Sequence, residues 1–285
     1  MKFKETVVLV TGASRGLGAA FATYLAESGA TVAINSTGSN DAGENLTKAL
    51  SNAGHQALYV PGPAEQGQKL VEEVLSQAGR IDAIVHNAGF VRDKTIRKMT
   101  STQWDEVLDL HLKASYQLSQ AAWASFEEQG GGRLVFVSSS AGLYGNFGQG
   151  NYAAAKMGMY GLCQSIALEG AAANICCNCV APFGATELNS ANMDEDFKSL
   201  IKAEYIAPLI AYLSHPECTE TGGMFEASAG SFKKLRWERS KGLRLNPTED
   251  MSLSALADGW PKVIDFTASE HPTDMRNALR AMYER

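Results

Sequence analysis

The sequence predicts an α/β fold of the Rossmann type, with a doubly wound parallel sheet of seven strands, helices on both faces and a C-terminal extension. Apolar runs alternate with longer segments of helical period before residue 215, which is the pattern of a parallel sheet covered on both sides. Continuous apolar runs such as Val7–Val10 and Leu134–Val137 are typical of strands buried on both faces.

The individual elements follow from these runs and from the turn residues between them. We expect strands at Thr6–Val10, Thr31–Asn35, Gln56–Val60, Ile81–His86, Arg133–Val137, Asn174–Ala181 and Gly223–Glu226. We expect helices to begin near Gly16, Asp41, Ala64, Thr100, Gly150 and Lys202. Thr100 lies three residues before Gln103, the spacing of a capping box at the start of a long amphipathic helix.

The alternation ends near Ser228, and basic residues then become frequent. We interpret 1–230 as the main domain. We expect 231–285 to be an extension packed on it, because so short a segment buries little core by itself.

The composition excludes several classes of function. The chain has 285 residues, 45% of them hydrophobic and 20% charged, and a formal net charge of −6. These values are typical of a soluble globular protein and give no reason to expect nucleic acid as a partner. No run approaches the roughly 20 apolar residues that span a bilayer, so no membrane partner is expected. Neither a secretory signal nor a Ser-Lys-Leu peroxisomal signal is recognised, and we predict a cytoplasmic protein.

Three of the five cysteines are close together in the sequence, at Cys176, Cys177 and Cys179. A structural zinc site needs a second pair of ligands at a suitable spacing, and only the isolated Cys163 and Cys218 remain. Free cysteines also behave as small hydrophobic side chains in a buried strand. We therefore predict no metal site.

A glycine-rich segment follows the first expected strand and opens the first expected helix. Glycines permit a tight turn there and let backbone amides approach a pyrophosphate at the helix N-terminus. Such turns are common, but the strand–turn–helix context predicts nucleotide binding. The expected contacts are Gly12, Ser14, Arg15, Gly16, Leu17 and Gly18.

The end of the second expected strand bears on the choice of cofactor. An acid about 20 residues beyond the glycine motif bonds the ribose 2′-hydroxyl in NAD-binding domains. This chain has Asn35, Ser36 and Thr37 there, and an acid that would repel a 2′-phosphate is missing. Together with Arg15 in the glycine loop, Ser36 favours NADP(H) over NAD(H). The alternative is that Arg15 is a solvated loop residue.

Tyr152 and Lys156 lie four residues apart at the start of an expected helix and therefore share one of its faces. An ammonium about 4 Å from the phenol would favour phenolate by up to ~4 kcal/mol at an effective dielectric of about 20, before desolvation is subtracted. The pair could thus act as an acid–base.

Ser139 follows the strand Leu134–Val137, whose carboxyl end lies at the ligand crevice of a parallel sheet. Asn87, Ala88 and Gly89 form a turn at the same edge.

Taken together, these residues resemble the short-chain dehydrogenase/reductase family over about residues 5–230. The glycine loop, Asn87-Ala88-Gly89, Ser139 and the Tyr152/Lys156 pair occur in the family's order. The resemblance implies hydride transfer between a nicotinamide and a carbinol or carbonyl carbon. It implies that Ser139 polarises the substrate oxygen, that Tyr152 exchanges its proton, and that Lys156 holds the ribose hydroxyls and lowers the pKa of Tyr152. We also expect cofactor contacts from Pro182 and Thr186.

A narrower resemblance is to the (3R)-hydroxyacyl-CoA dehydrogenase domains of peroxisomal multifunctional enzymes. It implies a 3-hydroxyacyl or 3-oxoacyl thioester as the small-molecule substrate, with activity on hydroxysteroids as a further option, and a homodimer; a homotetramer is the alternative assembly. The segments that carry it are 90–94, 109–112, 142–152 and 235–239, and it extends to about residue 266.

The chain departs from these families at three positions. His111 stands where an asparagine is usual, and we keep His111 as a candidate catalytic residue without assigning it a proton relay. Ser36 replaces an aspartate of the acyl-CoA group, and Gly62 stands near the place of an aspartate that contacts adenine. Because of the changes at Ser36 and Gly62, the NAD preference of the acyl-CoA group does not carry over to this chain.

Three functions remain open from the sequence. The first is a dehydrogenase or reductase of acyl thioesters, and the second is a hydroxysteroid or secondary-metabolite ketoreductase with the same catalytic group. The third is a nucleotide-binding scaffold with low activity, which the residues at 36 and 62 keep open. For a CoA substrate, Lys233, Lys234, Arg236 and Arg239 are candidate phosphate partners. We favour instead a solvated basic face with Trp237 packed inward.

Overall fold

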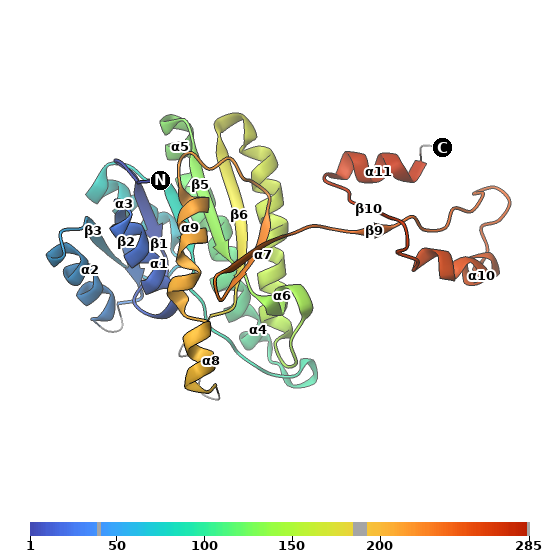
Figure 1. The fold of residues 1–285 in the computed structure, drawn as a ribbon, viewed down its shortest axis with the longest axis horizontal. Coiled ribbons are helices and arrows are strands. Elements are labelled where there is room, and N and C mark those ends of the chain that lie inside the picture. The colour runs from blue at the N-terminus through green and yellow to red at the C-terminus, as the bar shows by residue number, and fades with distance from the viewer. Residues whose placement is uncertain (39–40, 185–192, 284–285) are drawn as a thin grey trace. The chain divides into compact units, whose positions relative to one another are not determined.

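The computed structural model describes residues 1–38, 41–184 and 193–283 (Figure 1). Its centre is an eight-stranded sheet with the strand order β3-β2-β1-β4-β5-β6-β7-β8. The pairings from β3 to β7 are parallel, and Val7–Val10 is in register with Thr31–Ile34. The strands are β1 Val7–Val10, β2 Thr31–Ser36, β3 Ala57–Pro61, β4 Ala83–His86, β5 Gly132–Val137, β6 Ile175–Pro182, β7 Met224–Ser228 and β8 Ser231–Leu235.

The strand order reverses between β1 and β4, which confirms the doubly wound fold. The seven expected strands are all present, but the predicted number is one too small. A two-residue turn with positive φ at Ala229 (49°) and Gly230 (73°) leads directly into β8. β8 was missed because it is an exposed edge strand containing Lys233 and Lys234, and such a strand has no continuous apolar run.

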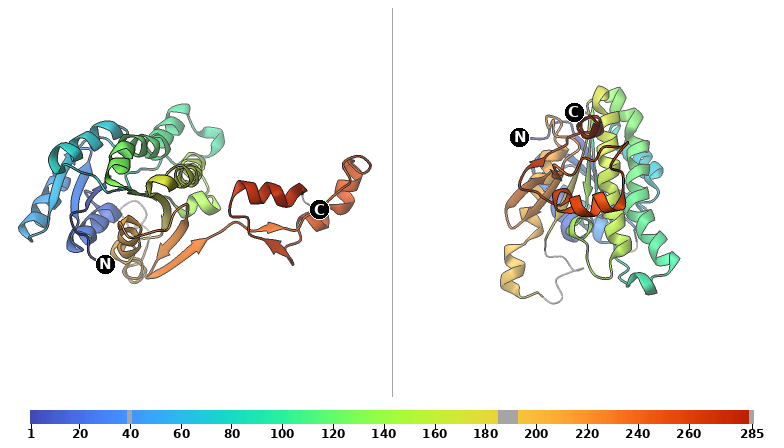
Figure 2. Two further views of the ribbon diagram at one scale, coloured as in Figure 1. Left: turned by 90° about the horizontal axis from the view of Figure 1, so that it is seen from above. Right: turned by 90° about the vertical axis from the view of Figure 1, so that its right-hand side faces the viewer.

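Helices cover both faces of the sheet (Figures 1 and 2). On one face, Val8, Val10 and Val135 join a core with Phe21 and Ile210 from two of the helices. The alternate strand residues, such as Leu9, Ile84 and Leu134, are also fully buried, so the central strands are mostly apolar along their length. The helices of the main unit are α1 Gly16–Glu27, α2 Ala42–Asn52, α3 Gly67–Ala78, α4 Ser101–Leu108, α5 Ala114–Gln129, α6 Ser140–Tyr144, α7 Gly150–Glu169, α8 Glu195–Leu200 and α9 Ala207–Ser214.

The long helix expected from Thr100 is present in a modified form. Thr100 and Gln103 make both bonds of the capping box, as predicted. After α4 the chain makes one π-helical turn, Asp109–Lys113, before α5 begins. Such turns are often found at functional sites, and this one contains His111.

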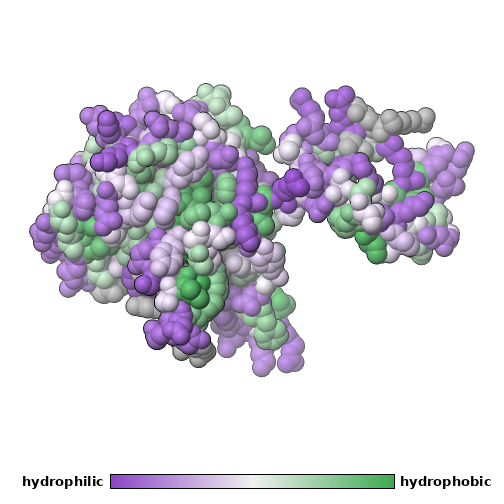
Figure 3. All heavy atoms as spheres, in the orientation of Figure 1, coloured by the Kyte–Doolittle hydropathy of each residue, from purple (hydrophilic) through white to green (hydrophobic). Residues whose placement is uncertain are grey.

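The chain divides into two compact units, Met1–Lys234 and Leu235–Arg285. In the second unit, β9 (Arg239–Ser240) pairs antiparallel with β10 (Ser269–Glu270), next to α10 (Leu253–Val263) and α11 (Met275–Tyr283). None of its described side chains is buried, and both hydrophilic and hydrophobic residues are visible on its surface in Figure 3. Packing of this unit on the main one stays a prediction.

Two of the four basic residues predicted as phosphate partners form ion pairs with acids. Lys234 pairs with Glu220 at 2.6 Å, and Arg239 pairs with Glu270 at 2.6 Å. The side chain of Trp237 is 52% exposed, and its inward packing stays a prediction together with the packing of the second unit.

None of the helices within the described ranges combines the length and the apolar character that a bilayer span requires.

Candidate active site

The glycine loop packs against the turn that follows β4. Gly12 has a φ of 62°, and a Cβ there would lie 2.7 Å from the Cα of Ala88. Asn87 Nδ2 donates to the carbonyls of Thr11 and Gly12, at 3.1 Å in both cases. A side chain at Gly18 would collide with the Gly12 carbonyl and the Asn87 amide. The two predicted cofactor segments therefore meet at the point where the strand order reverses.

Buried polar contacts hold this junction together. The Thr11 hydroxyl accepts from the backbone N–H groups of Asn87 and Ala88, both at 3.0 Å, and lies 2.9 Å from His86 Nδ1. Burial, assisted by the charge of Lys156, lowers the pKa of His86 to about 4. His86 is therefore neutral near pH 7, so that Nε2–H donates to the Leu110 carbonyl at 3.1 Å while Nδ1 accepts from Thr11.

The residues present fit the pyrophosphate of a dinucleotide. Helix α1 begins immediately after the loop at Gly16, whose φ is 56°. Its first turn contains no acidic residue, and no side chain caps it. The first amides of a helix have no intrahelical partner and carry the positive end of the dipole, so they favour an anion. Ser14 and Leu17 are half-buried at this turn, whereas Arg15 is exposed.

The structure does not bring Ser36 to the surface beside Arg15. Ser36 is buried, its hydroxyl lies 3.1 Å from Tyr59 Oη, and a Cβ at Gly43 would lie 2.6 Å from Ser36 Oγ. Thr37, the residue directly after β2, is exposed. The expectation that the Ser36 side chain selects the cofactor is therefore corrected, because that side chain is enclosed by β3 and α2.

Ser139, Tyr152 and Lys156 lie together beyond the carboxyl end of β5, as the sequence predicts. Ser139 caps α6, where its Oγ accepts from Ala141 N at 3.2 Å, and it also hydrogen-bonds Tyr152. Lys156 Nζ donates to the Val137 carbonyl at 2.5 Å and lies 5.5 Å from the centroid of the Tyr152 ring. The Ser139 hydroxyl and the phenol can thus reach one substrate oxygen.

The expected effect of Lys156 on Tyr152 is wrong for this structure. Burial raises the pKa of Tyr152; the hydrogen bond from Ser139 opposes this rise, and the charge of Asp93 adds to it. Burial also lowers the pKa of Lys156 to about 7. Desolvation is the largest cause of both shifts, and the lysine Nζ lies over the Tyr152 ring and donates to a carbonyl.

His111 lies directly against Tyr152. Their ring centroids are 5.1 Å apart in an edge-to-face arrangement, and His111 Nε2 is 2.9 Å from the Phe90 carbonyl. Burial lowers the pKa of His111 well below its ordinary value, and the charge of Lys156 adds to this effect. The neutral ring donates through Nε2–H, and its buried Nδ1 has no hydrogen-bond partner.

The other predicted site residues lie at the same edge of the sheet, with one exception. Asn87, Ala88 and Pro182 are half-buried and Gly89 is exposed. Thr186 lies outside the described residues.

All five cysteines are buried. Within the part of the chain that the structure describes, no group of His, Cys, Asp or Glu residues could hold a metal ion.

Sequence reasoning missed Asn151 and Asp93. Asn151 is fully buried and bonds the backbone N–H of Tyr152 at 2.8 Å. The carboxylate of Asp93 is close enough to affect the pKa of Tyr152 and accepts from Gln149 Nε2 at 3.1 Å. For Asn151, the one signal in the sequence was its position directly before Tyr152. A single polar residue at such a position does not by itself indicate a functional role.

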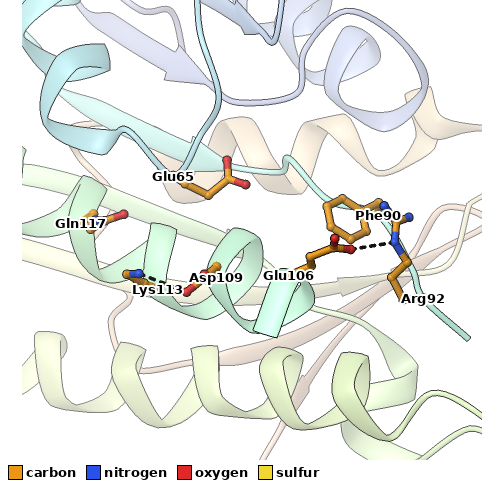
Figure 4. A pocket seen from close by; sticks show the side chains of 7 residues that line it. All are labelled: Glu65, Phe90, Arg92, Glu106, Asp109, Lys113 and Gln117. Atoms are coloured by element: carbon orange, nitrogen blue, oxygen red, sulfur yellow. Dashed lines mark hydrogen bonds and ion pairs between the residues drawn. The ribbon is translucent and has the colours of Figure 1, made fainter. Parts of the chain in front are cut away.

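A cavity of about 460 Å³ opens beside α4 and α5, and none of the predicted site residues lines it (Figure 4). Two ion pairs cross its wall, Arg92 with Glu106 and Lys113 with Asp109. Its lining residues are Glu65, Phe90, Arg92, Glu106, Asp109, Lys113 and Gln117.

The comparison with protein families now decides the assignment, because the model of the family described as short chain dehydrogenase matches residues 6–196. The chain belongs to the short-chain dehydrogenase family. It is accordingly an oxidoreductase of a family that uses NAD(P).

Relatives match beyond the family region. Peroxisomal multifunctional enzyme type 2 of Mus musculus is 38% identical over 100% of this chain and 40% of its own length. Peroxisomal hydratase-dehydrogenase-epimerase of Neurospora crassa is 39% identical over 100% of this chain and 33% of its own length. A short-chain type dehydrogenase/reductase of Mycobacterium tuberculosis is 33% identical over 94% of this chain and 96% of its own. The chain thus spans less than half of the two multifunctional relatives.

Solved structures agree with this family. Full-length peroxisomal multifunctional enzyme type 2 from Drosophila melanogaster has a TM-score of 0.86 and 33% identity, covering 99% of this chain and 50% of that one. A short chain dehydrogenase from Mycobacterium avium has a TM-score of 0.82 and 28% identity, covering 92% of this chain and 97% of that one.

Proposed function

We propose that this oxidoreductase transfers a hydride between a nicotinamide cofactor and a 3-hydroxyacyl or 3-oxoacyl thioester of the CoA type. The observation that carries the proposal is the meeting of Ser139, Tyr152 and Lys156 at the edge of the sheet where the glycine loop also lies. The thioester substrate is supported by the similarity to multifunctional enzymes over the whole chain, including residues 235–285.

Each catalytic side chain has a separate task in this proposal. Ser139 donates a hydrogen bond to the substrate oxygen, and the Tyr152 hydroxyl gives that oxygen a proton during reduction or takes one during oxidation. The raised pKa of Tyr152 keeps the phenol protonated near pH 7, which suits proton donation. A bound nicotinamide supplies or accepts the hydride. Lys156, with a pKa of about 7, is partly charged at neutral pH and can hold the ribose hydroxyls.

The test is nicotinamide absorbance with purified protein. We expect acetoacetyl-CoA or a longer 3-oxoacyl-CoA to consume reduced cofactor, and we expect Tyr152→Phe to abolish most of this turnover. The thioester assignment is wrong if these substrates are inert while a steroid ketone or another ketone is reduced. If the protein binds the nicotinamide cofactor but turns over none of these substrates, the scaffold alternative is favoured.

We infer further that the cofactor is NADP(H) in preference to NAD(H). The end of β2 has no acid, and Arg15 and Thr37 are both exposed near the glycine loop and the end of β2. A fluorescence titration with NADPH and NADH tests this inference. We expect Arg15→Ala to weaken NADPH about tenfold, the effect of one charge-assisted contact, and to leave NADH unchanged. Tighter binding of NADH by the parent protein would contradict it.

We propose that the protein is a homodimer or homotetramer. A hollow of about 420 Å³ between α5, the π-helical turn and α7 is lined by Leu108, Leu112, Tyr116 and Leu162, together with Asp109 and Lys113. Tyr116 is 48% exposed there, as expected for an apolar face that a second copy covers. Sedimentation equilibrium should give a multiple of the chain mass, and Tyr116→Glu should shift the protein toward monomer. A monomeric parent protein would contradict the proposal.

Cytoplasmic location and packing of residues 231–285 on the main domain remain predictions. The multifunctional relatives are named peroxisomal, so imaging of the tagged full-length protein against a peroxisomal marker is the direct test of location. If the extension packs on the main domain, protease cleavage between the two units should be slow in the intact protein.

A further inference from the structure

The residue before the catalytic tyrosine is a fully buried asparagine with all of its hydrogen-bonding atoms engaged. Asn151 Nδ2 donates to the Gln103 carbonyl at 2.9 Å and to the Arg92 carbonyl at 3.3 Å. Its Oδ1 accepts from the backbone N–H of Tyr152 at 2.8 Å. One side chain therefore connects the start of α7, the first turn of α4 and the segment that follows β4.

The bond to Tyr152 replaces one that the helix cannot make. Helix α7 begins at Gly150, and its N-cap residue, Gln149, forms no side-chain cap. The first amides of a helix lack an intrahelical carbonyl partner, and the amide of Tyr152 is one of these. Asn151 consequently holds the peptide from which the catalytic phenol projects.

His111 contacts both Tyr152 and the segment that follows β4. Its Nε2–H donates to the Phe90 carbonyl at 2.9 Å, and its ring lies edge-to-face on the phenol ring. Two buried side chains thus bind the carbonyls of Phe90 and Arg92, two residues apart, while both also contact Tyr152. A buried amide or imidazole that lost these partners would leave unsatisfied polar groups, so the arrangement has few alternatives.

We propose that Asn151 and His111 are positioning residues, which hold Tyr152 in its reactive place by tying it to the backbone segment Phe90–Arg92. The proposal rests on the proposed role of Tyr152 as the proton donor and acceptor. Neither residue exchanges a proton with the substrate in this arrangement. Their effect on the reaction passes through the placement of the Tyr152 hydroxyl.

The first experiment compares Asn151→Ser with Asn178→Ser in the full chain. Asn178 is an equally buried asparagine, in β6, that donates to the Glu220 carbonyl at 2.7 Å and accepts from the Gly223 N–H at 3.1 Å. Serine is too short to make either set of bonds. Amide hydrogen exchange by nuclear magnetic resonance should accelerate at Tyr152 in the first variant and at Gly223 in the second.

Kinetics then separate positioning from general stability. We expect Asn151→Ser to lower kcat about 10- to 100-fold with little change in KM, because a small displacement of a reacting group has effects of this size. Its pH–rate profile should also shift, since the hydrogen bond from Ser139 to the phenol depends on that placement. Asn178→Ser should retain the parent kcat and pH profile below its unfolding temperature.

The second experiment uses His111. In His111→Gln the side-chain Nε2 can still donate to the Phe90 carbonyl, whereas His111→Leu cannot donate at all. We expect glutamine to retain most of kcat and leucine to lose about tenfold or more. A glutamine variant as impaired as the leucine variant would overturn the positioning role of His111 in favour of direct participation of the ring.

The remaining outcomes distinguish the two proposals. Unchanged exchange at Tyr152 and unchanged kcat in Asn151→Ser would overturn the positioning inference and leave the proposed function intact. Equal loss of kcat in the Asn151 and Asn178 variants would also overturn it, because the effect would then be one of general stability. If Tyr152→Phe has the activity of the parent protein, the proposed role of Tyr152 fails, although exchange at the Tyr152 amide still reports whether Asn151 holds it.

Discussion

The candidate site lies along one edge of the sheet, and its cofactor end and its catalytic end are built on different principles. At the cofactor end, the glycine loop and the turn after β4 meet through backbone atoms, with close approaches that only glycine allows. At the catalytic end, the proposed reacting groups are side chains whose proton affinities depend on burial. A site made of backbone atoms therefore depends on local conformation. A proton-transfer site depends also on the burial and the charges that its neighbours impose on the reacting side chains.

Removing the phenol hydroxyl should have the largest effect and should leave the cofactor end intact. We expect Tyr152→Phe to lower kcat by about 10²- to 10⁴-fold, the usual contribution of a general acid–base. The dissociation constant for NADPH, measured by fluorescence, should change less than about twofold, because the pyrophosphate contacts come from the glycine loop. A large loss of cofactor affinity would show that the two ends are not separable.

The buried lysine should make stability depend on pH. Lys156 has a pKa of about 7 in the folded protein, against 10.5 for the ordinary side chain. The unfolded chain therefore holds more protons between these two values, and the free energy of unfolding should rise as pH increases from about 7 toward 10. Below pH 7 this destabilisation is fully present and is at most on the order of 5 kcal/mol.

Urea unfolding at several pH values measures this slope, and Lys156→Met should flatten it. A slope of the same size in Lys156→Met would assign the pH dependence to other groups. Neither His86 nor His111 has a pKa inside this window, because burial lowers both below the ordinary value of 6.5.

A substitution that removes the Thr11 hydroxyl tests how much the buried hydrogen bonds of the cofactor end contribute to stability. Thr11→Val removes the acceptor for two backbone N–H groups and the partner of His86 Nδ1. We expect the free energy of unfolding to fall by about 2–3 kcal/mol, the cost of leaving buried polar groups unpaired. Thr11→Ser keeps the hydroxyl and should lose less than half of that. Equal losses in the two variants would assign the effect to the missing methyl group.

A glycine pair provides the smallest and most specific test. Gly12 and Gly54 both have positive φ, but a Cβ at Gly54 has no neighbour within 4 Å, whereas one at Gly12 meets Ala88. Gly54→Ala should cost about 1 kcal/mol from backbone strain alone. Gly12→Ala should cost more, about 2 kcal/mol, and should also weaken NADPH binding. Equal costs, measured by thermal unfolding, would mean that the loop can move away from the turn.

The backbone site was the easier of the two ends to predict. The motif from Thr11 to Gly18 contains its own turn geometry, and its place after an apolar strand set the location of the helix N-terminus. The Ser139, Tyr152 and Lys156 positions were also predictable, since strand ends and helix spacing determine which residues share an edge. β8 was not, because an exposed edge strand lacks the apolar run that identifies a buried one.

By itself, then, the sequence predicted the places of seven strands along the chain, the glycine turn and the proposed reacting groups, because these predictions depend on local conformation and periodicity. Only the tertiary structure decided that burial raises the pKa of Tyr152 in spite of Lys156, that Tyr59 and Gly43 enclose Ser36, and that Asn151 and His111 flank the tyrosine. These features depend on desolvation and on contacts between segments far apart in the chain, and neither can be derived from the spacing of residues along it.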